Sequence, residues 1–196
     1  MKIIGLTGGI ACGKSTVSKA LRALGAAIID ADALAHRLSR PNQPLFNAYV
    51  ARFGQEIVTA DGTLDRSALA RLVFADPAVR AEVDAIAHPL IRTAAEECLR
   101  AAEREQKRAA VLDVPLLFEA EWDALADETW VVALSEKEQL TRLLARDRTM
   151  SAGEAQARIA AQKCSRAYVV IDNSRTKEET RKYIEKLWKE RILDRA

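Results

Sequence analysis

The chain has 196 residues, of which 49% are hydrophobic and 30% are charged, and its formal net charge is +2. This length suits one domain of ordinary size, and the apolar content is too high for a disordered chain. A nucleic-acid-binding protein usually shows a clustered basic excess, whereas Lys and Arg are spread along this chain, so no nucleic-acid partner is expected. No apolar run approaches the ~20 residues of a membrane span, so no membrane association is expected either.

The cysteines are three in number and far apart, at Cys12, Cys98 and Cys164. No pair has the spacing of zinc ligands, so a zinc site is not expected. The first residues lead directly into a glycine turn and do not resemble a secretory signal. We therefore expect no disulfides and a cytoplasmic location.

Five short apolar runs favour β-strands. Because they lack strict alternation, they suit strands covered on both faces, as in a parallel sheet. The runs are Ile3 to Thr7, Ala27 to Asp30, Ala110 to Val114, Thr129 to Leu134 and Tyr168 to Asp172.

Helical segments separate these strands. One is predicted from Lys14 to Leu24, closed by Gly25, and a second from Pro89 to Lys107, with proline in its first turn. Strands that alternate with helices indicate an α/β layered fold with a parallel sheet. Three further helix starts show the Ser/Thr-x-x-Glu capping pattern: Ser135 with Glu138, Ser151 with Glu154, and Thr176 with Glu179.

The spacing of the strands is uneven, because about eighty residues separate the second from the third. We expect one domain, 1–196, with an inserted helical subdomain over residues 33–108 and a smaller insertion over 136–166. The core then consists of residues 1–32, 109–135 and 167–196.

The strongest signal is the run Gly8 to Thr16, which matches G-x-x-x-x-G-K-[ST] and lies between a predicted strand and a predicted helix. The glycines allow the backbone to curl so that amides point at phosphate oxygens, and the helix N-terminus adds positive potential. Lys14 is expected to reach the β- and γ-phosphates of ATP, and Ser15 to offer its hydroxyl to Mg²⁺. The alternative is a glycine-rich turn that merely joins strand to helix.

We expect residues along the whole loop to contact the nucleotide. Cys12 is expected to act through its backbone amide rather than its thiol. Thr16 is either a second hydroxyl near the phosphates or an ordinary helix residue. The predicted ATP-binding residues are Gly8, Gly9, Ala11, Cys12, Gly13, Lys14, Ser15 and Thr16.

A phosphate loop alone does not distinguish a metabolite kinase from a motor or a GTP-controlled switch. The chain contains neither the Asn-Lys-x-Asp segment that reads guanine nor the Asp-x-x-Gly segment that senses a γ-phosphate. A motor is normally larger or part of a ring. A small-metabolite kinase is therefore favoured.

A kinase must orient or deprotonate the acceptor hydroxyl. Asp30 and Asp32 lie at the C-terminal end of the second strand, where ligands bind in open α/β sheets. Residues two apart on a strand project to the same side, so both carboxylates are expected to face the crevice, with Asp32 as the base. The alternative is that one of the two only caps the following helix.

A kinase must also neutralise the charge on the transferred group. Arg142 and Arg146 are spaced to share one helix face, with Arg148 and Arg158 further on, and together they are predicted to form a lid that contacts phosphates. The alternative is a solvated charged helix. Asp113, at the end of the third strand, is predicted to hold the Mg²⁺ water shell.

Beyond these motifs, the chain resembles the dephospho-CoA kinase family over nearly its whole length. The resemblance is carried by Gly5 to Ile10, Asp30-Ala31-Asp32, Phe53-Gly54, Asp61 to Arg66, His88 to Ile91, Asp113 to Glu119, Arg142-x-x-x-Arg146, Arg158-Ile159-x-x-Gln162 and Ile171-Asp172-Asn173.

The resemblance implies transfer of the ATP γ-phosphate to the ribose 3′-hydroxyl of dephospho-CoA, with a nucleotide core, a helical CoA-binding subdomain and a lid. It implies that Asp32 is the base and that Asn173 lies near the adenine. It also implies an acceptor site that includes His88, Pro89, Arg92, Leu116, Leu117, Phe118 and Glu119. The rival interpretation is another small-metabolite kinase, acting on a nucleoside monophosphate or a shikimate-like alcohol.

Overall fold

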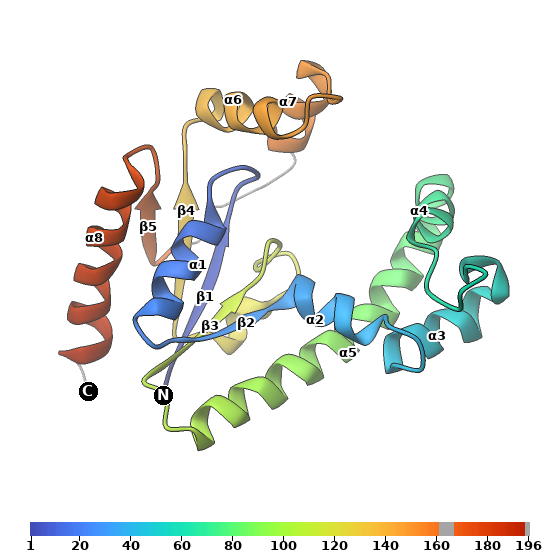
Figure 1. The fold of residues 1–196 in the computed structure, drawn as a ribbon, viewed down its shortest axis with the longest axis horizontal. Coiled ribbons are helices and arrows are strands. Elements are labelled where there is room, and N and C mark those ends of the chain that lie inside the picture. Colours follow the sequence, from blue (N-terminus) through green and yellow to red (C-terminus); the bar gives the residue numbers. More distant parts are fainter. Residues whose placement is uncertain (161–166, 195–196) are drawn as a thin grey trace. The chain divides into compact units, whose positions relative to one another are not determined.

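The computed structural model describes residues 1–160 and 167–194 and contains a five-stranded sheet with strand order β2-β3-β1-β4-β5 (Figure 1). The pairs β1–β3, β1–β4 and β4–β5 are parallel. The predicted parallel α/β architecture is confirmed, and every predicted strand lies within one residue of its observed bounds. These bounds are β1 Lys2–Gly8, β2 Ala27–Asp30, β3 Ala109–Asp113, β4 Glu128–Ala133 and β5 Val169–Asp172.

Eight α-helices occur in the described part of the chain, and all three predicted capping boxes are formed. Ser135 Oγ accepts from the Glu138 amide at 3.3 Å, and the same arrangement recurs at the starts of α7 and α8. Short 3₁₀ helices at Gln55–Ile57 and Trp122–Leu125 and a π-helical turn at Lys189–Leu193 complete the elements. The helices are α1 Lys14–Ala23, α2 Ala31–Leu38, α3 Pro44–Phe53, α4 Arg66–Ala75, α5 Pro77–Arg104, α6 Glu136–Arg146, α7 Ala152–Ala160 and α8 Lys177–Trp188.

The start predicted for the long helix at Pro89 is wrong, because α5 begins at Pro77 and Pro89 lies inside it. Pro77 takes the first helical position, where its missing N–H costs nothing, and the Asp76 carboxylate accepts from the Ala78 amide at 2.8 Å. This cap starts the helix three turns early. Inside the helix, Pro89 removes one backbone hydrogen bond without ending it.

Strand β5 also departs from expectation. Its residues alternate, with Val169 and Ile171 buried and Val170 56% exposed. Val170 and Asp172 are exposed, so the face of β5 that carries them meets solvent, whereas β3 is buried at every position. The prediction that every strand is covered on both faces is therefore wrong for this edge strand.

The chain divides into two compact units, Met1–Ile29 with Ala102–Ala196, and Asp30–Ala101. The first holds the sheet with α1, α6, α7 and α8, and the second is helical. In the first unit, each fully buried aliphatic side chain stabilises the fold by roughly 1.5–3 kcal/mol. Its main core joins β1, α1, β4, β5 and α8 and includes Ile4, Leu6, Val17, Leu21, Trp130, Ile171 and Ile184.

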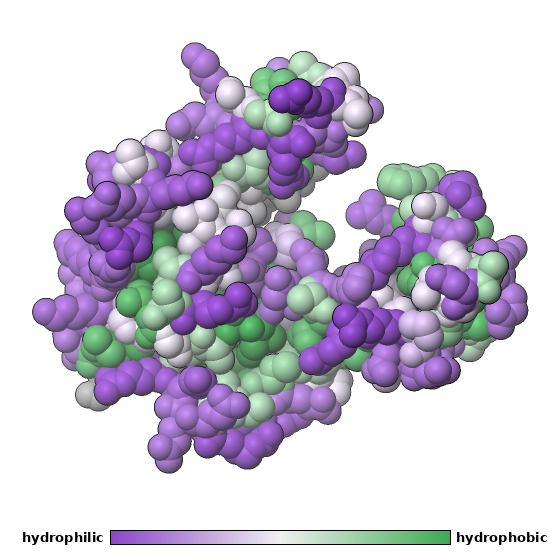
Figure 2. All heavy atoms as spheres, viewed as in Figure 1, coloured by the Kyte–Doolittle hydropathy of each residue, from purple (hydrophilic) through white to green (hydrophobic). Residues whose placement is uncertain are grey.

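The surface in Figure 2 belongs mostly to hydrophilic residues. Many charged side chains pair one helical turn apart, as Arg181 does with Glu185. Solvated helix faces therefore account for much of the charge of the chain. Within the described residues, no helix combines the length and apolarity that a bilayer crossing requires.

A buried carboxylate anchors the first unit at the amino ends of its strands. Glu128 accepts from Lys2 Nζ at 2.7 Å, Trp130 Nε1 at 3.1 Å and Arg191 Nη1 at 3.2 Å. Burial alone would raise the pKa of Glu128, but the hydrogen bonds of Lys2 and Trp130 and the charges of Lys2 and Arg191 together hold it below 4.5. The carboxylate thus ties β1, β4 and the C-terminal helical turn together.

We expect Glu128→Gln to lower the free energy of unfolding by about 2 kcal/mol, because three donors lose an ionised acceptor. The pKa of Glu128 is lower in the folded protein than in the unfolded chain, so the ionised carboxylate stabilises the fold at pH values above the unfolded-state pKa. This contribution is present at neutral pH and is lost as the pH falls below 4.5. Urea unfolding at pH 7 and at pH 3.5 measures it. The difference between wild type and variant should shrink at the lower pH, and the exposed Glu103→Gln is the matched control.

Candidate active site

The loop between β1 and α1 has the backbone of an anion-binding site. Ala11 has φ 60° and Gly13 has φ 85°, so both residues that flank Cys12 take the left-handed conformation. Left-handed residues in a tight turn are typical of backbone concavities that bind anions. No side-chain cap is present at Gly13, the N-cap of α1, so no capping side chain competes with a ligand for the start of the helix. The predicted strand–loop–helix context is confirmed.

Two glycines of the loop are required by their surroundings. A Cβ on Gly8 would lie 2.7 Å from the Val132 carbonyl oxygen of β4. A Cβ on Gly13 would overlap the Asn173 side-chain amide, and its positive φ already disfavours other residues. The loop is therefore seated against β4 and against the turn that follows β5.

Lys14 and Asp113 are brought together as an ion pair. Lys14 is the first residue of α1, and Asp113 is the last residue of β3, in register with Leu6 of β1. The Asp113 side chain is only 8% exposed. Lys14, predicted to bind phosphate, and Asp113, predicted to hold the Mg²⁺ water shell, thus meet at the carboxyl edge of the sheet.

The remaining loop residues differ in what they present. Ser15 is exposed in the first turn of α1, whereas the amide of Thr16 donates to the Gly13 carbonyl at 2.9 Å. The Cys12 side chain is buried in the core. The Cys12 amide donates to the Gly9 carbonyl at 3.1 Å, so it closes the turn itself.

Asn173, which follows β5, is buried against this loop. Its Nδ2 donates to the Cys12 carbonyl at 2.7 Å, and its Oδ1 accepts from Thr180 Oγ1 at 3.0 Å. Its main-chain carbonyl accepts from Arg142 Nη2 at 3.0 Å. The predicted contact of Asn173 with adenine stays a prediction, and the contacts observed are with the loop, α6 and α8.

The helices of the predicted lid also contact the loop. Ile10 and Ala11 pack against a cluster centred on Leu143, Ala155 and Ile159 of α6 and α7. Arg142 Nη1 lies 3.7 Å from the position that a Cβ on Gly13 would take. Arg146, Arg148 and Arg158 are exposed. Residues 161–166, the predicted end of the lid, lie outside the described part of the chain.

The carboxylates of Asp30 and Asp32 do not share one face of a strand, because β2 ends at Asp30 and α2 begins at Ala31. Asp30 is the N-cap of this helix, and its side chain accepts from the Ala33 amide at 3.0 Å. Asp32 is exposed in the first helical turn. The expectation that both project to one side is therefore wrong, and the alternative that one of them caps a helix holds for Asp30.

The predicted acceptor residues fall into two groups. On α5, His88 and Pro89 are exposed and Arg92 Nε pairs with Glu96 at 3.4 Å. After β3, Leu117 is fully buried, with its Cδ2 2.9 Å from where a Cβ on Gly5 would lie. Leu117 is therefore a core residue, whereas Leu116 and Glu119 are exposed and Phe118 is half-buried.

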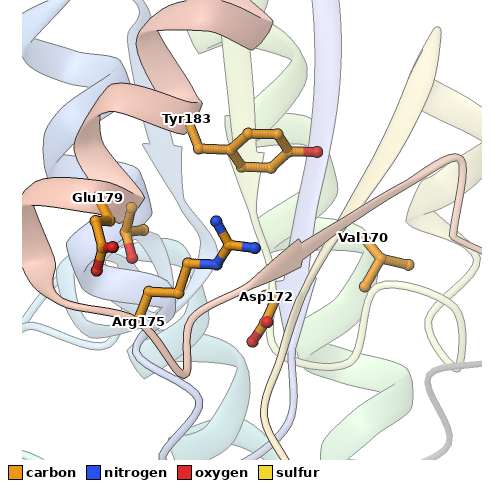
Figure 3. A pocket seen from close by; sticks show the side chains of 6 residues that line it. Val170, Asp172, Arg175, Glu179 and Tyr183 are labelled. Carbon is orange, nitrogen blue, oxygen red and sulfur yellow. The ribbon is translucent and has the colours of Figure 1, made fainter.

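Cavities are also lined by residues outside the loop. One of about 210 Å³ lies between edge strand β5 and α8, lined in part by Val170, Asp172 and Arg175 (Figure 3). Hydrogen bonds from Ser174, together with the charge of Arg175, lower the pKa of Asp172. This carboxylate therefore stabilises the turn that follows β5. Another, of about 320 Å³, is an apolar groove in the helical unit, lined in part by Tyr49 and Phe74.

Sequence reasoning missed Thr180 as a support of the loop, and it missed the packing of the loop residue Ile10 against α6 and α7. Thr180 is a buried polar residue one turn into α8, and its hydroxyl orients Asn173. Its position directly after the Thr176–Glu179 capping box is the only sequence signal. Ile10 is an apolar residue at an x position of the loop, which indicates an apolar contact. Only the fold shows that this contact is with α6 and α7.

Comparisons with known proteins agree with this geometry. The sequence model described as dephospho-CoA kinase matches residues 2–179. A dephospho-CoA kinase of Symbiobacterium thermophilum is 49% identical over 194 residues, covering 96% of this chain and 81% of the relative. A Thermus thermophilus crystal structure, TT1252, superposes with a TM-score of 0.78 at 34% identity over 97% of both chains. Dephospho-CoA kinase from Campylobacter jejuni superposes at 0.75 with 26% identity over both full chains.

Proposed function

The chain belongs to the dephospho-CoA kinase family, and we propose that it transfers the γ-phosphate of ATP to the ribose 3′-hydroxyl of dephospho-CoA to give CoA. Phosphorylation of dephospho-CoA with ATP follows from the family, and the ribose 3′-hydroxyl is the acceptor position that we propose. The observation that supports it most is the uncapped, left-handed loop with Lys14 and Arg142 beside it. The rival acceptors, nucleoside monophosphates and shikimate-like alcohols, are not favoured.

In the proposed mechanism the loop amides and the α1 N-terminus bind the phosphate chain of ATP. Lys14 leaves Asp113 for the β- and γ-phosphates, exchanging one anionic partner for another. Arg142, held beside Gly13, supplies a second cation where charge develops on the transferred group. Arg146 is proposed to contact phosphates from the same helix.

Mg²⁺ is the expected cofactor, and the residues present fit it. Ser15 and Asp113 offer a hydroxyl and a carboxylate near the loop, whereas the described residues contain no cluster of three or more His, Cys, Asp or Glu side chains. Mg²⁺ binds most often through one or two protein oxygens together with substrate phosphates and waters, which this set allows. When bound, the ion neutralises phosphate charge.

Asp32 is proposed as the base that receives the proton of the 3′-hydroxyl. Its carboxylate is exposed, and chain geometry keeps its Cα within about 7 Å of that of Asp30, the last residue of β2. Strand ends of an open α/β sheet are where ligands bind. Asp30, already used as a cap, is left to support the start of α2.

We also propose a separate role for each part of the chain. Residues 33–108 are proposed to bind the acceptor, with His88, Pro89 and Arg92 contributing from α5 and Leu116 to Glu119 from the core, Leu117 through packing alone. Residues 136–166 are proposed to act as the lid that keeps water from the phosphoryl group. A cytoplasmic location, where ATP is available, is proposed as well.

A panel of acceptors tests the function. The protein is incubated with ATP and Mg²⁺ and with dephospho-CoA, AMP, shikimate or no acceptor, and ADP and phosphorylated products are measured. We expect rapid turnover with dephospho-CoA and with none of the other acceptors. Comparable turnover with another acceptor, or ADP release without any acceptor, would contradict the proposal.

A further inference from the structure

Asn173 joins three elements that meet at the phosphate loop. It follows β5, and its amide continues the sheet by donating to the Ala133 carbonyl of β4 at 3.0 Å. The residue is 6% exposed. Its position is therefore set by the sheet, and its side chain is a fixed point against which the loop can be held.

The orientation of the Asn173 side chain is determined by its partners. The Cys12 carbonyl can only accept, so the group that faces it at 2.7 Å must be the Nδ2 donor. The opposite end, Oδ1, then accepts the Thr180 hydroxyl proton at 3.0 Å. A carboxylate in this place would set an acceptor against an acceptor.

The bond to Cys12 acts on the part of the loop that takes the left-handed conformation. The carbonyl of Cys12 belongs to the peptide unit that leads into Gly13, whose φ is 85°. The same Asn173 amide fills the space where a Gly13 Cβ would lie. Rotation of this peptide unit would break the hydrogen bond and move the Gly13 amide at the start of α1.

The main chain of Asn173 holds a second group. Its carbonyl accepts from Arg142 Nη2 at 3.0 Å, and the other guanidinium nitrogen, Nη1, lies beside Gly13. One residue thus fixes the loop through its side chain and a lid arginine through its backbone.

We propose that Asn173 is a positioning residue for nucleotide binding, which holds Cys12 and Gly13 in the phosphate-binding conformation and Arg142 beside them. The proposal deepens the proposed function and rests on it only for the identity of the nucleotide. Asn173 acts through the loop and through Arg142.

The test compares Asn173→Asp with Asn42→Asp, the same amide-to-carboxylate change at an exposed residue. The measured quantities are the Kd for Mg–AMP-PNP by calorimetry without acceptor, kcat, the KM for dephospho-CoA, and Tm. For Asn173→Asp we expect the Kd to rise about tenfold or more and kcat to fall, because a buried hydrogen bond becomes a repulsion. The KM of Asn173→Asp for dephospho-CoA should change little. The control Asn42→Asp is judged by nucleotide affinity alone, and its Kd for Mg–AMP-PNP should match wild type.

A second variant, Thr180→Val, keeps Asn173 but removes the hydroxyl that orients it, and a smaller rise in Kd is expected. It also decides the question if Asn173→Asp does not fold. Unchanged AMP-PNP affinity in folded Asn173→Asp, measured well below its Tm, or in Thr180→Val if the former is unfolded, would overturn the proposal. Because this readout needs no acceptor, failure of the wild type to phosphorylate dephospho-CoA would refute the proposed function separately.

Discussion

Replacing Lys14 with alanine is expected to lower kcat/KM for ATP by at least about 100-fold, since the variant loses the cation that meets the charge of the transferred phosphoryl group. The ion pair with Asp113 shows that the ammonium group already lies at the edge where the loop binds phosphate. Steady-state kinetics with saturating dephospho-CoA measures the loss. Thermal unfolding of the same samples separates it from a loss of folded protein.

Lys19→Ala is the matched control, because Lys19 is exposed on the same helix. It should retain wild-type kinetics. If Lys14→Ala kept kcat/KM within a few-fold of wild type while folded, the loop would not be the catalytic phosphate site.

Asp32→Asn is expected to lower kcat by about 100-fold or more, because asparagine keeps the shape of the side chain and cannot accept the hydroxyl proton. The affinity for Mg–AMP-PNP should remain close to that of wild type, since Asp32 belongs to α2 and not to the phosphate loop. Single-turnover kinetics with saturating dephospho-CoA measures the chemical step. Asp194→Asn, an exposed carboxylate near the C-terminus, is the control.

A wild-type single-turnover rate in Asp32→Asn would remove the residue from the mechanism. A loss of nucleotide affinity equal to the loss of rate would instead make it a binding residue. Both results would leave the family assignment intact, because that assignment rests on the whole chain.

The sequence predicted the elements well where local signals are strong. Apolar runs located all five strands, and the capping box at Thr176 located α8, since the cap is made by residues three apart. Prediction was wrong where two local signals compete. Pro77 and Pro89 are both acceptable first helical residues, and only the Asp76 cap decides between them.

The candidate site was predicted in its loop and missed in its supports. Lys14, Ser15 and Asp113 carry their own signals, a motif and a strand end. The bond from Asn173 to Cys12 joins residues 161 positions apart, and the buried Glu128 is held by donors from both ends of the chain. Such contacts follow from the way the sheet brings strands together, and no local pattern encodes them. The shared face predicted for Asp30 and Asp32 was wrong because β2 ends at Asp30, so the two-residue period of a strand does not reach Asp32.

Where the phosphate arrives tests the central claim most directly. ATP labelled in its γ-phosphate is supplied with dephospho-CoA and Mg²⁺, and the product is examined by ³¹P NMR and mass spectrometry. We expect the label on the ribose 3′-oxygen, in an amount equal to the ADP formed. Label on another hydroxyl, or free labelled phosphate released with the ADP, would contradict it.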